Sequence, residues 1–204
     1  IETLGGLHMT IDFVRTPDDR FESLPDFPYA PHYIDTLPGY EGLRVHYLDE
    51  GPRDAKRTFL CLHGQPTWSF LYRKMIPVLV EAGYRCIAPD MMGMGKSDKP
   101  IKEAFHYYDR HCEMMLTFIQ KLSLTNITAF VQDWGSLIGT RLVGENPDLF
   151  ARLVLANGDL PLLTEENNPL YIPNPVVVNP KINTVKDIAK YWLKGMPDMF
   201  QAWI

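Results

Sequence analysis

The stretch FVQDWGSLIG, Phe130 to Gly139, decides the fold of this chain. An apolar run stops abruptly at Gln132, and apolar residues with helical spacing resume after Gly135. This pattern predicts a buried strand, a sharp turn and a helix, with Asp133 on the corner. The N-terminus of a helix offers free N–H groups and partial positive charge, which suit a carboxylate. Asp133 is therefore either a helix cap or a reactive carboxylate, and this stretch alone leaves both open.

The rest of the chain repeats short apolar runs between helical patterns. Because strands that are apolar throughout alternate with helices, we expect an α/β fold: a mostly parallel sheet flanked by helices on both faces. Pro77 is expected to bend or restart the first helix. The expected strands cover residues 43–48, 58–62, 86–88, 127–131 and 153–156, and the expected helices cover residues 71–82, 108–122 and 137–143.

Composition divides the chain into three parts. Residues 1–12 are expected to be a leader or a cloning remnant, and residues 13–157 the N-terminal part of the core. The core opens with an ordered wrapping segment, residues 13–41, which is rich in Pro, Asp and aromatic residues. After Asn157 strand signals stop, and an extended excursion with five prolines leads to a short helix over 185–193. We expect residues 158–204 to be an incomplete cap domain.

Charge and cysteine content exclude several function classes. The net charge is −5 and Lys and Arg are scattered, so we expect no nucleic acid partner. No apolar run reaches the roughly 20 residues that a membrane-spanning helix needs, and no signal peptide pattern begins the chain. Cys61, Cys86 and Cys112 read as buried thiols in a reducing cytoplasm. Their spacing favours neither a disulfide nor a metal site, so we predict no metal and no cofactor.

A second corner follows the strand expected at 58–62. It reads His63-Gly64-Gln65-Pro66-Thr67-Trp68, the place where α/β-hydrolases carry a loop that offers a backbone N–H to developing negative charge. The corner around Asp133 likewise has the form of their nucleophile elbow, usually written Gly-x-Ser-x-Gly, with aspartate in place of serine. Two such corners about seventy residues apart favour catalysis over capping for Asp133.

At these motifs the chain resembles the haloalkane dehalogenases of the α/β-hydrolase superfamily. The resemblance rests on five segments and covers nearly everything from residue 14 to 158. It implies an α/β-hydrolase fold with a helical cap, acting on a small haloalkane and water. Asp133 would displace halide to form an alkyl-enzyme ester, which water hydrolyses to the alcohol. The segments are RTPDDRFESLPDFPYAPHY, GLRVHYLDEGP, FLCLHGQPTWSFLYRKMIP, IAPDMMGMGKSDKP and NITAFVQDWGSLIG.

The resemblance also implies halide-binding residues. Trp134 matches one halide-binding tryptophan, because an indole N–H donates a hydrogen bond and accepts none. The backbone N–H groups of Trp134 and Gln65 match the oxyanion hole. Gln65 departs from the usual Glu or Asn, so its side chain either donates toward halide or leaves only its backbone N–H in use. Trp203 in the cap is the candidate for the second halide donor, and Trp192 is the other candidate.

The catalytic histidine and acid of the family are not expected in this chain. They would lie in C-terminal core strands absent here, so the chain resembles the N-terminal two-thirds of a family member and would need a missing C-terminal segment. Asn157 stands where some members carry the acid, and Asp159 is a candidate whose alternative is a polar turn residue. Three other readings stay open: an epoxide hydrolase, a truncated or non-catalytic ligand-binding relative, and an interaction protein that docks through its proline-rich excursion.

Overall fold

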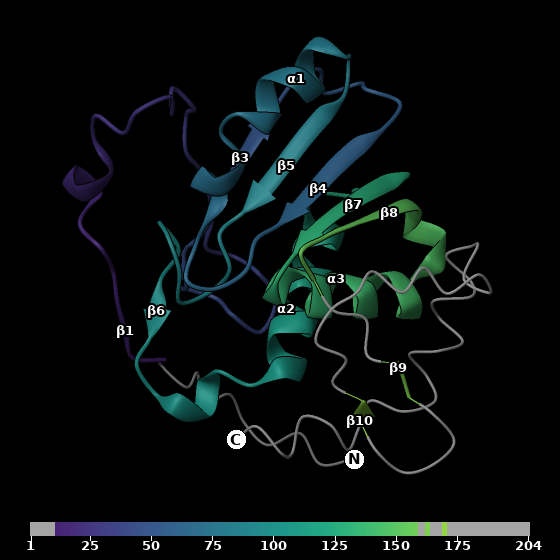
Figure 1. Cartoon of the computed structure of the whole chain (residues 1–204). Helices are drawn as coiled ribbons and strands as arrows, with labels where there is room; N and C mark the ends of the chain where they lie inside the picture. Colours follow the sequence, from purple (N-terminus) through teal and green to yellow (C-terminus); the bar gives the residue numbers. More distant parts are fainter. Residues whose placement is uncertain (1–10, 159–161, 164–168, 171–204) are drawn as a thin grey trace.

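A six-stranded sheet organises the molecule in the order β2-β3-β5-β4-β7-β8 (Figure 1). The computed structural model describes residues 11–158, 162–163 and 169–170. Strands β5, β4, β7 and β8 are parallel to one another, while β3 is antiparallel to both β2 and β5. The strands are β2 His32–Ile34, β3 Val45–Glu50, β4 Thr58–Leu62, β5 Arg85–Pro89, β7 Ile127–Gln132 and β8 Phe150–Ala156.

Helices lie on both sides of this sheet, as predicted (Figure 1). Helix α1 packs with η2 on one face, and helices α2 and α3 pack on the other. The helices are α1 Met75–Glu81, α2 Tyr108–Lys121 and α3 Trp134–Glu145, with short 3-10 turns η1 Asp18–Phe21, η2 Ser69–Tyr72, η3 Glu103–Phe105 and η4 Pro147–Leu149. No helix within these described residues combines the length and apolar character that a bilayer crossing requires.

Successive residues of the central strands supply two separate cores. Leu60 and Leu62 of β4 are buried with α2 and α3, whereas Cys61 between them is buried with Tyr72 and Ile76 on the α1 side. This alternation follows from the period of two along a strand. An apolar strand with helices on both faces can bury every side chain, which explains the uninterrupted TFLCL run of β4.

The wrapping segment is fastened to the core by charge and by aromatic packing. Arg15 donates two hydrogen bonds, of 2.6 and 2.7 Å, to the buried carboxylate of Asp98. Phe21 and Phe27 pack against Trp68, with ring centroids 5.2 Å apart in each pair. Residues 13–14 also form β1, which pairs with β6, residues Lys99–Pro100. The tryptophan of the HGQPTW stretch therefore packs beneath the N-terminal segment.

Several elements differ from the sequence predictions. The prediction that strand signals stop after Asn157 is wrong, because β9 Leu162–Leu163 pairs with β10 Pro169–Leu170. The wrapping segment contains β2, which is too short for a periodic pattern to reveal. The helix predicted over 71–82 restarts at Met75 and not at Pro77, because the proline lies in the first turn, where an N–H has no intrahelical partner.

Strand β8 departs from the expectation of a sheet covered on both faces. Its residues Val154 and Leu155 are 39% and 38% exposed, although the neighbouring β7 is almost fully buried. Within the described residues β8 is the last strand of the sheet, so one side pairs with β7 and the other side has no described neighbour. Residues 1–10 of the leader predicted over 1–12, and the helix predicted over 185–193, lie outside the described residues.

Candidate active site

The corner at Asp133 has the backbone of a strained elbow. Strand β7 ends at Gln132, helix α3 begins at Trp134, and Asp133 between them adopts φ 51° and ψ −125°. Residues other than glycine rarely adopt such backbone angles, and those that do are often found at functional sites. The Asp133 N–H donates to the carbonyl of Asn157 at 3.2 Å, and the Asp133 carbonyl accepts from the Ser136 N–H at 2.8 Å. The ends of β7 and β8 and the start of α3 thus hold the corner together.

The carboxylate of Asp133 faces the second corner and does not cap the helix. As the residue before α3, Asp133 makes no side-chain capping hydrogen bond. Its Oδ1 instead accepts a hydrogen bond of 3.0 Å from the backbone N–H of Gln65, which is 68 residues away in the sequence. Capping, the simpler explanation of an aspartate here, is therefore not what the side chain does.

Two glycines let the corners approach each other this closely. A Cβ on Gly64 would lie 2.2 Å from Oδ1 of Asp133, and a Cβ on Gly135 would lie 2.2 Å from the carbonyl oxygen of Leu62. Neither position has room for a side chain, because the atoms in the way belong to the nucleophile candidate and to the backbone of β4. The start of α3 is therefore seated directly on the end of β4.

The structure brings together some of the predicted site residues and leaves others outside its range. Asp133 and the backbone N–H of Gln65 are in contact, and Trp134 follows on the first turn of α3 with 38% of its surface exposed. The Gln65 side chain is exposed. The cap candidates for halide binding and the candidate acid, Trp192, Trp203 and Asp159, lie outside the described residues.

Three further residues hold the two corners in place, and the sequence predicted this supporting role for none of them. Ser136 is fully buried, and its hydroxyl donates to the Asp133 carbonyl at 2.5 Å. The carbonyl of Asn157 anchors the elbow, although the sequence suggested only a possible acid position there. Asp90 is a fully buried carboxylate at the end of β5. A charged residue directly after a buried strand is the one signal that could have identified Asp90.

Hydrogen bonds from three separate segments of the chain keep Asp90 ionised. The Ser69 N–H donates to its Oδ1, and the Lys96 N–H and the His46 ring nitrogen Nδ1 donate to its Oδ2, each at 2.8 Å. Burial alone would raise the pKa of the Asp90 carboxyl. The hydrogen bonds and the neighbouring His46 reverse this effect and lower that pKa below its ordinary value.

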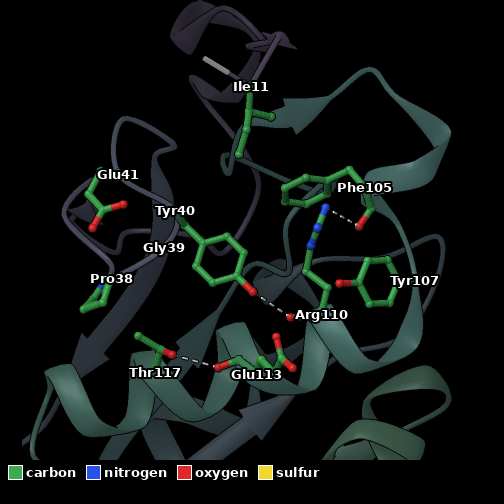
Figure 2. A pocket seen from close by; sticks show the side chains of 10 residues that line it. All are labelled: Ile11, Pro38, Gly39, Tyr40, Glu41, Phe105, Tyr107, Arg110, Glu113 and Thr117. Atoms are coloured by element: carbon green, nitrogen blue, oxygen red, sulfur yellow. Dashed lines mark hydrogen bonds between the residues drawn. The ribbon is translucent and has the colours of Figure 1, made fainter. Parts of the chain in front are cut away.

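A cavity of about 560 Å³ lies away from these corners, between the 38–41 turn and helix α2 (Figure 2). Figure 2 shows the rings of Tyr40, Phe105 and Tyr107 around Arg110. The guanidinium carbon of Arg110 lies 4.8 Å from the centroid of the Phe105 ring and 4.6 Å from that of Tyr107. Since no residue of either corner lines this cavity, we assign it no part in the chemistry of Asp133.

The chain is similar in sequence to known proteins. Residues 57–204 match the family model described as alpha/beta hydrolase fold. A haloalkane dehalogenase of Psychrobacter cryohalolentis is 56% identical over 150 residues, which make up 72% of this chain and 49% of that protein. One of Mycolicibacterium paratuberculosis is 50% identical over 159 residues, covering 78% of this chain and 52% of that protein. The chain spans about half the length of the curated relatives it matches.

Solved structures agree. The tetrameric haloalkane dehalogenase DpaA from Paraglaciecola agarilytica is 47% identical, with a TM-score of 0.72 over 75% of this chain and 52% of that one. An epoxide hydrolase from Vigna radiata is 23% identical with a TM-score of 0.56 over 62% of this chain and 38% of that one, a likeness of fold alone. The resemblance predicted from the motifs is thus confirmed: the chain belongs to the α/β-hydrolase fold family, and its relatives there include haloalkane dehalogenases.

Proposed function

We propose that the protein containing this chain hydrolyses the carbon–halogen bond of a small haloalkane, with Asp133 as the nucleophile. One observation carries the proposal: a carboxylate on a strained elbow faces a backbone N–H of the opposite corner and does not cap its own helix. A carboxylate nucleophile suits this reaction because carboxylates are ordinarily ionised at pH 7 and need no base for the first displacement.

In the first step Oδ2 of Asp133 attacks the halogen-bearing carbon. A C–O bond forms as the carbon–halogen bond breaks, and the halide leaves with the bonding electron pair. The Gln65 N–H favours attack by Oδ2, because its hydrogen bond of 3.0 Å holds Oδ1 and thereby orients the other oxygen. The product is an alkyl ester of Asp133 and a free halide ion.

In the second step water adds to the ester carbonyl carbon while a base takes its proton. Negative charge then develops on Oδ1, where the Gln65 N–H can stabilise it. When this intermediate collapses, its bond to the alkoxy oxygen breaks, the alcohol leaves with the hydroxyl proton, and the carboxylate is restored. The base then releases its proton to water. His63 does not fit the role of base, since both of its ring nitrogens are hydrogen-bonded to backbone groups. We therefore propose that the base and its acid partner come from outside the described residues.

The halide requires hydrogen-bond donors that carry no competing negative charge. We propose the indole N–H of Trp134 as one donor, because Trp134 directly follows the nucleophile on α3. Trp203 remains the candidate for a second donor in the cap. The exposed Gln65 side chain either adds a donor or leaves only its backbone N–H in use.

The role of the Gln65 side chain can be separated from that of its backbone. Gln65→Leu removes the amide donors and keeps the backbone N–H that faces Asp133. If the side chain donates to halide, the halide dissociation constant should rise about tenfold, which matches the loss of one hydrogen bond to a charged group. An unchanged constant would restrict Gln65 to its backbone N–H. Quenching of tryptophan fluorescence by bromide measures the constant.

The enzymatic proposal is tested with 1,2-dibromoethane. The complete protein should release bromide above an Asp133→Ala control, and the present chain should accumulate a 2-bromoethyl ester on Asp133 that peptide mapping locates. Absence of both results would refute the proposal. An epoxide hydrolase would instead add a whole epoxide to Asp133 without losing an atom, so styrene oxide in a parallel reaction separates the two activities.

The proposed partners are thus a small haloalkane, water and a halide ion. The described cysteines remain thiols, which supports the cytoplasmic location we propose.

A further inference from the structure

The peptide unit between Gly64 and Gln65 carries the donor that faces the nucleophile. In a planar trans peptide the C=O and the N–H point in opposite directions, so fixing the carbonyl also fixes the N–H. The Gly64 carbonyl lies 2.8 Å from His63 Nδ1 and accepts a second hydrogen bond, of 3.3 Å, from the Thr67 N–H. The N–H on the other side of this peptide is the one that donates to Asp133 Oδ1.

The contacts of His63 determine its tautomer. The Met91 N–H donates to Nε2 at 2.9 Å, so that nitrogen carries a lone pair. Nδ1 lies against a carbonyl oxygen, which only accepts, so Nδ1 carries the hydrogen. His63 is fully buried, and burial lowers its pKa below the ordinary value although the Gly64 carbonyl opposes the shift. A neutral imidazole with hydrogen on Nδ1 is the form that satisfies both partners.

The corner after β5 holds the loop 63–69 at both of its ends. At the first residue of the loop, the Met91 N–H donates to the His63 ring. At the last residue, the Ser69 N–H donates to the neighbouring Asp90 at 2.8 Å. His46 of β3 in turn holds Asp90, so the corner is tied to the sheet. The side chains of His63, Ser69, Asp90 and His46 are fully buried, so these hydrogen bonds lie away from solvent.

We propose that His63 is a positioning residue: by holding the Gly64 carbonyl through Nδ1–H, it turns the Gly64–Gln65 peptide so that the Gln65 N–H faces Asp133. It touches neither substrate nor nucleophile and acts through the orientation of this one peptide. Its importance for turnover rests on the proposed function, because the N–H matters most when negative charge develops on Oδ1 during ester hydrolysis.

Two substitutions separate positioning from simple structural support. His63→Asn places an amide donor near the position of Nδ1 and loses the acceptor for Met91. His63→Gln places an acceptor near the position of Nε2 and loses the donor for Gly64. We expect the Gln65 amide hydrogen, followed by NMR on the present chain, to exchange at least about tenfold faster in His63→Gln and near the wild-type rate in His63→Asn. Thermal unfolding of both variants confirms that each is folded at the temperature used.

The kcat and KM of His63→Asn and His63→Gln are then compared in the complete protein. Loss of one oxyanion donor costs about 10²–10³ in kcat, so a misdirected donor in His63→Gln should lower kcat at least about tenfold, and KM should fall with it. The alkyl ester should accumulate, because its hydrolysis slows more than its formation. His63→Asn should retain kcat within about threefold of wild type.

Equal Gln65 exchange rates in the two variants would overturn the positioning role, as would equal kcat values. A wild-type protein that neither releases bromide nor forms the ester would instead refute the proposed function. The amide exchange comparison would then still decide whether His63 orients the peptide.

Discussion

At the scale of single residues, the site depends on contacts that leave no room for an added methyl group. Gly64 lies against the Asp133 carboxylate, Gly135 against the carbonyl of Leu62, and Gly139 against the Val131 side chain. Only the first of these contacts touches the carboxylate itself. The same substitution, glycine to alanine, should therefore have different effects on the reaction of Asp133 at Gly64 and at Gly139.

Gly64→Ala should displace the Asp133 carboxylate, because its Cβ would lie 2.2 Å from Oδ1. A misplacement of about 1 Å can cost about a hundredfold in rate, so ester formation with 1,2-dibromoethane should slow by about that factor. Gly139→Ala is the matched control, since its Cβ would meet Cγ1 of Val131 at 2.4 Å. It should lower the free energy of unfolding by about 1–3 kcal/mol and leave the rate per folded molecule nearly unchanged. Similar rates in the two variants would contradict this account.

His111 makes stability depend on pH. Its ring stacks on His106 with centroids 5.6 Å apart. Burial, and then the charges of His106 and Arg110, lower the pKa of His111 from 6.5 to about 4. Folding therefore favours the neutral ring, and the unfolded chain takes up a proton first as the pH falls. The stability associated with the neutral His111 ring is fully present above pH 6.5 and is lost as the pH falls toward 4.

Replacing His111 by Gln should remove this dependence. Between pH 7 and pH 5, the free energy of unfolding of wild type should fall by about 2 kcal/mol more than that of His111→Gln. Urea denaturation at the two pH values measures the difference. Parallel pH profiles for the two proteins would show that His111 does not contribute.

At the scale of elements, the wrapping segment is fastened at a few points. Arg15 reaches the buried Asp98 carboxylate, which also accepts a hydrogen bond of 2.7 Å from the Arg44 N–H. The sequence predicted an ordered segment from its proline and aromatic content. It could not identify the ion pair, because its two residues are 83 positions apart.

Arg15→Met should lower the free energy of unfolding by about 2 kcal/mol, because it leaves the buried Asp98 carboxylate short of two charged hydrogen bonds. Thermolysin should then cut first within residues 13–34. Arg20→Met, in the same segment and exposed, should change stability by less than about 0.5 kcal/mol. Equal stability losses for the two variants would show that the ion pair does not fasten the segment.

At the scale of the whole molecule, strand β8 has an apolar sequence typical of a buried strand, but two of its apolar side chains are exposed to solvent. Its sequence FARLVLA resembles that of its neighbour β7 in apolar content, yet Val154 and Leu155 are more than one third exposed. Exposed apolar edge strands offer backbone groups and side chains to other chains. The present chain should therefore associate with itself through this edge.

Leu155→Lys should shift the present chain toward monomer in sedimentation velocity experiments, because a lysine on an edge strand opposes pairing. Val78→Lys is the control, since Val78 is 64% exposed and belongs to helix α1, not to a strand. It should leave the association state unchanged. If both lysine variants dissociate equally, general charge repulsion and not the β8 edge is responsible.

The sequence by itself determined the elements whose patterns are local. The predicted strand over 58–62 and the corner between strand and helix at Asp133 agree with the structure, because burial periodicity and a break in it are local properties. Only the tertiary structure decided what the Asp133 side chain does. The sequence placed an aspartate on the corner, and the fold shows that its carboxylate accepts a hydrogen bond from the Gln65 N–H, 68 residues away, in place of a capping bond. The tautomer of His63 was likewise decided in part by the Met91 N–H, 28 residues away, since contacts of this kind form only when the sheet assembles.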